Sequence, residues 1–449
     1  MNQSNQIRSK KNADALAGQA LLDIVQKQTL KYFWDFAHPV SGMARERSNV
    51  VSEYDYDLNC VTTGGTGFGI MGMIAATSRG WLTRQETLER VARIIGFLET
   101  AEKYHGILPH FLDGNTGKAI PFSRKDDGAD IVETSFLMMG LLSAREYFSA
   151  NTQEETALRE RINALWKDAD WNWHTRGGEK DLYWHWSPNH QWDMNLPVRG
   201  WNECLVTHVL AASSPTHPVS PDIYQQGWAG QPDFKNGRKH GTIKLTLGPP
   251  EGGPLFFAHY SFMGINPRGL KDQYADYWQQ NRNHVLINRA HCIENPHQHK
   301  GYGSDCWGLT ASDDHKGYSA HSPTNDNGAI SPTAALSSFP YTPKYAMQAL
   351  RHFYEDMGDK IWGKYGFIDA FNESEGWYAD SHLAIDQGAI VVMIENYRSG
   401  LLWDLFMNCP EVKQGLQKLG FESPYISPSP KRPRSVTGGS PKRDNKPEI

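Results

Sequence analysis

Apolar residues recur at helical spacing along most of this chain, and two kinds of segment alternate. The first kind is apolar almost throughout, as expected for helices that are buried on every side. These segments are 58–79, 128–149, 200–213, 330–339 and 385–406. The second kind is amphipathic or polar, as expected for helices with a solvent-facing side. These segments are 21–36, 83–104, 153–170, 270–289 and 342–357.

The alternation predicts an all-α fold in which inner helices are shielded by an outer ring, that is, an (α/α) toroid. Thr83 and Glu86 form a capping box, which marks the start of one outer helix. Strand-like alternation is sparse, and TIKLTL at 242–247 is its clearest case. An irregular helical solenoid is the alternative, but no repeat of fixed period supports it.

Long segments without helical periodicity interrupt the helices at 103–127, 172–199, 231–269 and 290–329. They are rich in aromatic residues, His, Gly or Asp, and loops of this length in a compact domain are usually functional. We therefore expect them to cover one face of the toroid and border a cleft. The ends are polar, so we predict a disordered N-terminus over 1–15, a folded domain over 16–421 and a disordered tail over 422–449.

Charge and cysteine content exclude several classes of protein. The net charge is −5 over 449 residues, which gives no basis for binding nucleic acid or an anionic membrane surface. No apolar stretch is long enough to span a membrane, and no apolar segment of a secretory signal follows the basic residues near the N-terminus. The five cysteines are widely spaced and form no CxxC motif, so neither a disulfide framework nor a zinc site is indicated.

Aromatic residues are concentrated in polar segments, where a hydrophobic core does not usually draw them. The chain has 15 Trp, and several of them lie between residues 171 and 192. Flat rings stack on the apolar faces of sugars, so this pattern suits a carbohydrate-binding surface. The alternative is that these side chains fill gaps between helices, because aromatic residues dominate cores and interfaces alike.

Acidic residues occur where inner helices are predicted to begin. Asp130 and Glu133 in ADIVETSFLMMGLL are three residues apart and share a helix face. Glycoside hydrolysis commonly uses two carboxyl groups, one to donate a proton and one to act on water or on the sugar carbon. A position at the edge of an apolar helix favours the protonated form of such a group. The alternative role is helix capping, since acids in a first turn complement the macrodipole.

Two further acids have a similar setting. Glu203 in RGWNECL follows Trp201, an arrangement that resembles a sugar platform beside an acid. Asp386 precedes a long apolar run. Glu395 lies within that run beside Arg398, which is more typical of a buried, paired structural group.

These segments resemble a known family. TTGGTGFGIMGMIAATSRGWLTR, ADIVETSFLMMGLL, RGWNECL, GGPLFFAHYSF, YGFIDAFN and IDQGAIVVMIENYRSGLLW occur in the order found in bacterial glucoamylase-like proteins, and more narrowly in the endo-β-1,2-glucanases of glycoside hydrolase family 144. The resemblance extends from about residue 20 to 420. It implies an (α/α)6 barrel that hydrolyses β-1,2-glucan with inversion at the anomeric carbon and without a metal. We also expect no cofactor and a monomeric protein.

The resemblance also implies the site. The cleft acids of the family match Asp130, Glu133, Glu203 and Asp386. We expect Glu203 to be the general acid and Asp130 or Glu133 to act on the water side, with a gap of about 6.5–9.5 Å between them, as inversion requires. The residues expected to contact sugar are Trp184, Trp186, Trp192, Trp201, His259, Tyr260, Tyr365 and Phe367. The lack of a recognisable signal favours the cytoplasm, whereas the family resemblance favours export to the periplasm or secretion.

Other activities remain open on the sequence alone. Relatives on this fold include enzymes that release sophorose from chain ends and transglycosylases. A non-catalytic glucan-binding protein would keep the aromatic cleft, but the intact acids argue against it. A lyase could use His259 and Tyr260 as its base, but it would need a uronic acid substrate and basic residues to neutralise it.

Overall fold

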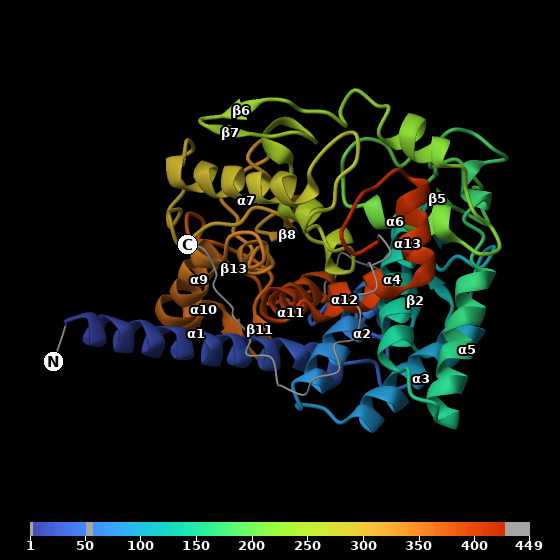
Figure 1. Cartoon of the computed structure of the whole chain (residues 1–449), viewed down its shortest axis with the longest axis horizontal. Helices are drawn as coiled ribbons and strands as arrows, with labels where there is room; N and C mark the ends of the chain where they lie inside the picture. The colour runs from blue at the N-terminus through green and yellow to red at the C-terminus, as the bar shows by residue number, and fades with distance from the viewer. Residues whose placement is uncertain (1–2, 51–56, 427–449) are drawn as a thin grey trace, which may run out of the picture.

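A computed structural model of the chain describes residues 3–50 and 57–426. The molecule is built mainly from helices, with a central group surrounded by an outer one (Figure 1). The central helices are α2 (Thr63–Ser78), α4 (Ile131–Tyr147), α6 (Leu205–Ser213), α8 (Pro332–Leu336) and α11 (Ala384–Arg398), with the 3-10 helices η4 (Leu255–Ala258) and η5 (Ser261–Met263). The helix-rich fold expected from the apolar pattern is thereby confirmed.

The central helices contact one another in a definite order. α2 packs against α4 on one side and α11 on the other, α4 packs against α6, α6 meets η5, and α8 packs against α11. A hydrogen bond of 3.0 Å between His259 Nε2 and Ser338 Oγ joins the end of η4 to the residues after α8. Each central helix is therefore held laterally by neighbours that are distant in sequence.

The outer helices lie around the central ones (Figure 1), and α3, α5 and α9 are clearly amphipathic. They are α1 (Gln3–Trp34), α3 (Arg84–Thr100), α5 (Gln153–Asp168), α7 (Tyr277–Glu294) and α9 (Pro343–Arg351). Shorter helices complete the chain: η1 (Trp173–Thr175), η2 (Ile223–Trp228), η3 (Pro250–Gly252), η6 (His352–Asp356), α10 (Gly358–Ile361), α12 (Leu401–Asn408) and α13 (Pro410–Lys418). α12 packs against α4 and α11, and α13 packs against α6.

All the strands of the described chain are short and belong to small antiparallel sheets. The three-stranded sheet contains β1 (Cys60–Thr62), β2 (Phe111–Asp113) and β3 (Ala119–Ile120). The two-stranded pairs are β4 (Ala129–Asp130) with β5 (His185–Trp186), β6 (Lys239–His240) with β7 (Ile243–Lys244), β8 (Ala311–Asp314) with β9 (Gly317–Ala320), β10 (Trp362–Gly363) with β11 (Gly366–Phe367), and β12 (Phe371–Asn372) with β13 (Trp377–Tyr378). They lie in or beside the long loops, and only two residues of TIKLTL become a strand.

Local signals explain where several helices begin and end. The capping box predicted at the start of α3 is confirmed, because the Thr83 side chain accepts from Glu86 N while the Glu86 carboxylate accepts from Thr83 N. The apolar run predicted as one helix over 385–406 is instead two helices. α11 ends before Gly400, whose φ of 75° is left-handed, and α12 starts at Leu401.

The structure differs from the expectation at the N-terminus, since α1 already begins at Gln3 within the segment predicted to be disordered. A polar segment can continue a helix whose later turns pack on the core, as the buried Leu22 and Val25 do here. Most of the predicted tail, residues 427–449, lies outside the described residues, as do residues 1 and 2.

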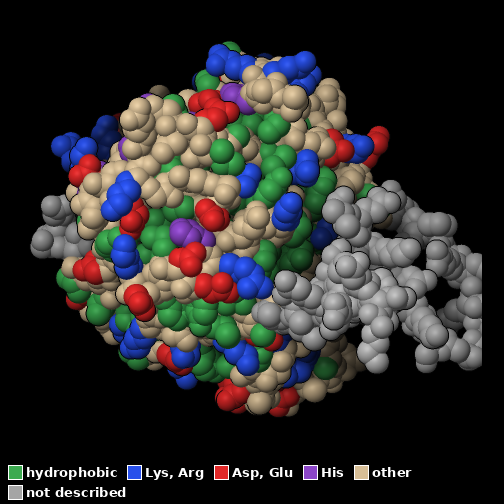
Figure 2. Space-filling view, turned by 90° about the vertical axis from the view of Figure 1, so that its left-hand side faces the viewer, with side chains coloured by type: hydrophobic (Ala, Val, Ile, Leu, Met, Phe, Trp, Pro, Cys, Tyr) green, Lys and Arg blue, Asp and Glu red, His purple; other side chains and the backbone are tan. Residues whose placement is uncertain are grey.

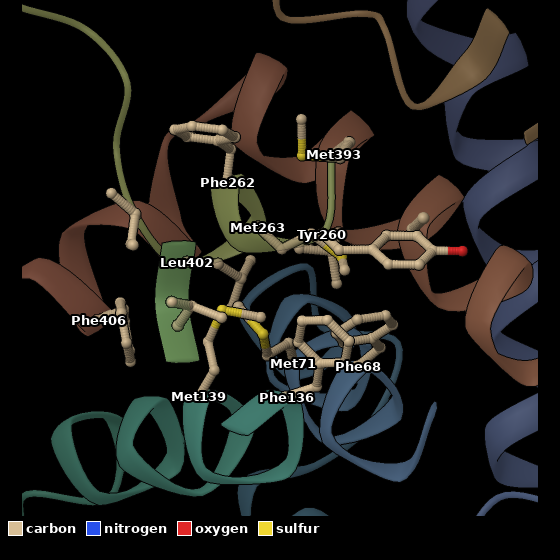
Figure 3. Close-up of a cluster of buried hydrophobic side chains, with 14 of the residues drawn as sticks. Phe68, Met71, Phe136, Met139, Tyr260, Phe262, Met263, Met393, Leu402 and Phe406 are labelled. Atoms are coloured by element: carbon tan, nitrogen blue, oxygen red, sulfur yellow. The ribbon is translucent and has the colours of Figure 1, made fainter. Parts of the chain in front are cut away.

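The core of the molecule lies where the central helices converge. Phe68 and Met71 from α2 meet Phe136 and Met139 from α4, and Tyr260 enters from the segment between η4 and η5 (Figure 3). The Tyr260 ring belongs to this cluster, but its hydroxyl points away from it (Figure 3).

At the core, α2 and α4 cross with their backbones in contact. A Cβ atom added at Gly67 would overlap the Phe136 carbonyl and lie 2.6 Å from the Leu137 Cα. A Cβ atom added at Gly140 would overlap the Gly67 carbonyl. Only glycine permits this approach, so the crossing fixes how far α4 is displaced along α2.

The surface shows no segregation of charge on the face seen in Figure 2, where acidic and basic side chains are interspersed. This agrees with the small net charge of −5. Over the described part of the chain, every helix is either too short or too polar to cross a lipid bilayer.

Candidate active site

A cavity of about 400 Å³ opens where several central helices begin. Its lining comes from segments far apart in sequence, and it contains three acids and many aromatic rings. The lining residues are Glu46, Arg47, Thr62, His110, Phe111, Phe122, Val132, Glu133, Phe136, Trp184, Glu203, Phe256, Tyr260, Ala311, Tyr318, Ala320, Leu383 and Ile385. A concave, largely apolar site with a few converging polar groups is typical of a small-molecule pocket.

Glu133 lies in the first turn of α4, and its carboxylate is held from the neighbouring helix. The Gly64 N–H at the start of α2 donates to Glu133 Oε2 at 2.8 Å, and His110 Nε2 lies 3.9 Å from Oε1. The side chain is buried, with 5% of its surface exposed. Because the crossing of α2 and α4 sets this distance, the position of the carboxylate follows from the packing of the core.

Asp130 caps the same helix and does not line the cavity. Its Oδ1 accepts from Val132 N and Glu133 N, both at 2.9 Å, and its Oδ2 lies 3.1 Å from His110 Nδ1. The pairing of β4 with β5 places His185 opposite Asp130, with its Nδ1 3.6 Å from Oδ2. Asp130 therefore orients His110, which in turn faces Glu133.

Glu203 precedes α6 and lines the cavity together with Glu133. Its backbone is held by Ser261 of η5, whose hydroxyl donates to the Glu203 carbonyl and accepts from Val206 N at 2.9 Å. The side chain is 8% exposed. The two acids thus come from two adjacent central helices, α4 and α6, and meet at one cavity.

Burial controls the protonation of these acids. It raises the pKa of Glu203 to about 7, and the negative charges of Glu133 and Asp130 contribute to the rise. It also raises the pKa of Glu133 to about 7, aided by Asp130 and opposed by His110. Burial acts to lower the pKa of His110, but the attraction of Glu133 and Asp130 outweighs it and raises that pKa to about 9. Near neutral pH the site therefore holds an imidazolium beside carboxyls that readily exchange a proton.

A second group of acids lies beside the cavity. Arg47 pairs with Glu46 at 2.8 Å and with Asp313 at 3.2 Å. Asp313 N donates to Asp369 Oδ2 at 2.7 Å, and the Asp369 carboxyl faces that of Asp386, in the first turn of α11. Asp369 and Asp386 are almost fully buried, and neither is part of the cavity lining.

Aromatic rings surround the cavity. Phe122 is 54% exposed and stacks on His110, with a centroid separation of 4.5 Å. Tyr318, on strand β9, is 48% exposed and lines the cavity, as do Trp184 and Tyr260. Such rings can stack on the apolar faces of a bound sugar.

The other residues expected to contact sugar lie away from the cavity lining. Trp201 is 3% exposed and packs against Trp228 and Phe262 in the core. An aromatic residue beside an acid has the same local sequence whether it faces a core or a cleft, so sequence alone did not separate the two. The others that do not line the cavity are Trp186, Trp192, His259, Tyr365 and Phe367.

One cluster of the described residues has donor atoms close enough to surround a metal ion. The atoms of His110, Asp126 and Asp130 lie within 4.8 Å of one another. These side chains already have partners within the protein. Asp130 Oδ1 caps α4, and Asp126 Oδ1 lies 3.1 Å from His185 Nδ1. The expectation of a metal-free site stays a prediction.

Several site residues were not identified from the sequence. His110 and Phe122 lie in the loop 103–127, which was expected to border the cleft but gave no residue-level signal. Asp369 lies in YGFIDAFN, a motif in which only the aromatic residues were selected. Glu46 and Arg47 belong to a segment without periodicity, and their proximity to the acids depends on contacts with residues more than 260 positions away.

Gly64→Ala is expected to lower kcat/KM by about 10²-fold, the scale of the loss when a reacting group is displaced by about 1 Å. The added Cβ would overlap Glu133 Oε2 and lie 3.1 Å from a Phe136 ring carbon. The overlap is with the end of a side chain, so folding should persist. Steady-state kinetics and thermal melting test this, with Gly72→Ala as the control, because its Cβ meets Val391 at an ordinary 3.4 Å. Wild-type activity in Gly64→Ala would show that the position of Glu133 is unimportant.

Comparisons with known proteins give a consistent result. Residues 195–410 match the Glycoamylase family model, described as "Putative glucoamylase". The chain is 55% identical to an endo-β-1,2-glucanase from Chitinophaga pinensis, solved with sophorotriose and glucose, with a TM-score of 0.88 over 91% of this chain and 99% of that one. It is also similar to a β-1,2-glucanase structure from Parabacteroides distasonis, with 43% identity and a TM-score of 0.87 over 90% of this chain and 60% of that one.

A relative from Parabacteroides distasonis, an exo β-1,2-glucooligosaccharide sophorohydrolase acting at the non-reducing end, is 43% identical over 425 residues. The match covers 90% of this chain, and the chain spans 58% of that relative's length. The endo-β-1,2-glucanase of Talaromyces funiculosus shares the fold, with a TM-score of 0.63 at 11% identity.

Proposed function

The chain belongs to the glucoamylase-like family, and from this premise we propose that it is a glycoside hydrolase that cleaves β-1,2-glucosidic bonds with inversion. The observation that carries the proposal is the meeting of Glu133 and Glu203 in one aromatic-rimmed cavity, although 70 positions separate them in the sequence. Burial keeps both acids near the pKa that proton transfer at neutral pH requires.

Glu203 is the proton donor in this proposal. A general acid must be protonated when substrate binds, and the pKa of about 7 leaves a large fraction of Glu203 protonated at neutral pH. The proton moves to the glycosidic oxygen as the bond from that oxygen to C1 breaks. Water attacks C1 from the opposite face and gives its own proton to a carboxylate.

Two carboxyls are candidates to take the proton from water. Glu133 lines the cavity beside Glu203. Asp386 lies in the first turn of α11. Glu203 lies just before α6, and on one side of the central group α2 and α4 lie between these two helices. Inverting pairs need the wider carboxyl spacing, and this favours Asp386 as a second candidate. Azide can replace the attacking water, so the alanine variant that azide rescues identifies the acceptor.

The architecture proposed for this chemistry is the (α/α)6 toroid. The central helices α2, α4, α6, α8 and α11 each follow one of the five outer helices in the chain, and η4–η5 follows the short helix η2 in the corresponding place. The contacts between successive central elements support a closed ring. In this arrangement the acids begin inner helices and therefore gather at one end of the toroid.

The test of the proposed function is hydrolysis of β-1,2-glucan followed by proton NMR. Inversion of a β-linkage gives the α-anomer as the first product, and retention gives the β-anomer. A ladder of oligosaccharides indicates endo cleavage, whereas sophorose alone indicates the exo action named for one relative. No release of reducing sugar would leave the glucan-binding alternative, and formation of longer chains would indicate a transglycosylase.

The activity is expected to have a narrow pH optimum near neutrality. Glu203 must be protonated, so kcat/KM falls as pH rises above its pKa of about 7. The water-side carboxyl must be ionised, and the pKa of Glu133 and that of Asp386 are both raised to about 7, so kcat/KM also falls below that value. Kinetics in buffers from acid to alkaline pH test this. A flat plateau over several pH units would contradict these protonation states.

A further inference from the structure

The carboxyls of Asp369 and Asp386 face each other beside the cavity without a visible means of neutralising their charge. The nearby acids Glu46 and Asp313 share Arg47. Within residues 3–50 and 57–426, Asp369 and Asp386 form no ion pair with a basic side chain, and Asp369 Oδ1 and both carboxyl oxygens of Asp386 are buried with no partner other than each other and the Tyr260 hydroxyl. Two adjacent carboxylates cannot both be ionised in such a place.

A proton between the two carboxyls removes this conflict. Each facing oxygen is then either a donor or an acceptor, and the pair carries one negative charge instead of two. Burial raises the pKa of Asp369 well above its ordinary value, and the charge of Asp386 adds to the rise. Burial also raises the pKa of Asp386, to about 7, while a hydrogen bond from Asp369 opposes that rise. The two carboxyls therefore hold one proton between them.

Asp369 is held in the orientation that this role needs. Its backbone N–H donates to Ser381 O at 2.9 Å, and its carbonyl accepts from Ser331 Oγ at 2.6 Å. Its Oδ2 accepts from Asp313 N at 2.7 Å, which leaves Oδ1 for the neighbouring carboxyl. Both ends of the side chain are fixed, so the proton is presented in one direction.

We propose that Asp369 is a positioning residue for hydrolysis: its protonated carboxyl donates a hydrogen bond to Asp386 and keeps that carboxyl ionised and oriented on the water side. The proposal rests on the proposed function and specifies one of its two candidate acceptors. The groups around the pair are Asp313 from β8, Glu46 and Arg47 from the segment before β1, Tyr260 between η4 and η5, and Tyr318 from β9.

Two substitutions of Asp369 distinguish a role in orienting Asp386 from a role in the stability of the fold. In Asp369→Asn, the amide can still donate to Asp386 and accept from Asp313 N, so kcat/KM should stay within about tenfold of wild type. In Asp369→Ala, both contacts are lost, and kcat/KM should fall about 10²-fold, the scale seen when a supporting hydrogen bond is removed. The acidic limb of the pH profile should also move to higher pH, because the ionised form of Asp386 loses a donor.

Asp380→Ala and Asp380→Asn are the controls, since Asp380 is an exposed neighbour whose carboxylate accepts from Asn49 Nδ2. Both should keep the wild-type acidic limb. A uniform loss of activity in Asp369→Ala with an unmoved acidic limb would overturn the proposal. So would a folded Asp369→Asn variant with no more activity than Asp369→Ala.

Infrared spectroscopy tests the proton without using activity. In the Glu133→Gln/Glu203→Gln background, which removes two of the three acids of raised pKa from the cavity wall and leaves Glu46, a protonated-carboxyl band that disappears on adding Asp369→Asn should be present at neutral pH beside any band of Glu46. Absence of the band refutes the shared proton even if the enzyme hydrolyses glucan. A band without any hydrolysis would refute the proposed function instead and leave the carboxyl pair as a structural fact.

Discussion

Replacing Glu203 with glutamine is expected to lower kcat on β-1,2-glucan by about 10³-fold, within the range that general acid catalysis contributes. Glutamine has the same shape but cannot supply a proton to the departing oxygen. The backbone contacts of Glu203 with Ser261 do not involve the carboxyl, so the fold should be retained. A β-linked oligosaccharide should bind within a few-fold of wild type by calorimetry, because only the proton transfer is lost.

The leaving group offers a sharper test of this role. An aryl glycoside with an acidic phenol as its leaving group needs little protonation, so Glu203→Gln should lose much less activity on it than on the glucan. The alkaline limb of the pH profile should also vanish. Glu89→Gln, an exposed position on α3, serves as the matched control and should behave as wild type. Equal losses on both substrates would assign the proton to another residue.

Gly67→Ala is expected to destabilise the protein by about 2 kcal/mol. Overpacking a core typically costs about 1–3 kcal/mol. We take the upper end, about 3 kcal/mol, because the added atom meets the backbone of α4 and not a flexible side chain. Replacing glycine with alanine within a helix returns about 1 kcal/mol, which partly offsets that cost. The free energy of unfolding from urea denaturation, followed by circular dichroism, measures the net effect.

Gly72→Ala is the matched control for this prediction because it makes the same change in the same helix. Its Cβ would meet only Val391 at 3.4 Å, so the gain in helix propensity should leave the protein as stable as wild type or slightly more stable. If both variants had the same stability, the close crossing of α2 and α4 would not be a determinant of the fold. Activity should fall in Gly67→Ala as well, since Glu133 moves with α4.

The helices were predictable because each depends on a pattern within its own segment. The apolar run before and after Phe136 gave α4, and Thr83 with Glu86 gave the start of α3. The break between α11 and α12 was missed because the whole segment 385–406 was taken as one run, although Arg398 in the last turn and Gly400 after it are local signals of a helix end. Whether the inner elements close into a six-fold ring depends on contacts between distant segments, which no local pattern reports.

The sequence predicted the acids that lie at the start of an apolar helix, because a carboxyl is unusual in that position. Glu133 and Glu203 were selected because an acid at the edge of an apolar helix is unusual, and both line the cavity. Asp130 satisfied the same rule, but its carboxylate caps α4 and binds His110. Trp201 and His259 are buried for packing, which a sequence motif cannot distinguish from sugar contact. Asp369 acquires its role only when folding brings it against Asp386.

The Gly64 N–H holds Glu133, and Gly67, one turn later in the same helix, makes the close crossing with α4. The same part of α2 therefore positions a catalytic carboxyl and stabilises the fold. We therefore expect few substitutions at Gly64 and Gly67 to be tolerated when the enzyme evolves to act on glucans of another length.

We expect variation to be better tolerated at the tip of the β8–β9 hairpin in the 290–329 loop. This tip brings Tyr318 to the cavity and is not part of the α2–α4 crossing. Exchange of residues 315–320 alone between relatives is the direct route to altered product size, because it changes Tyr318 and keeps Asp313, whose N–H holds Asp369.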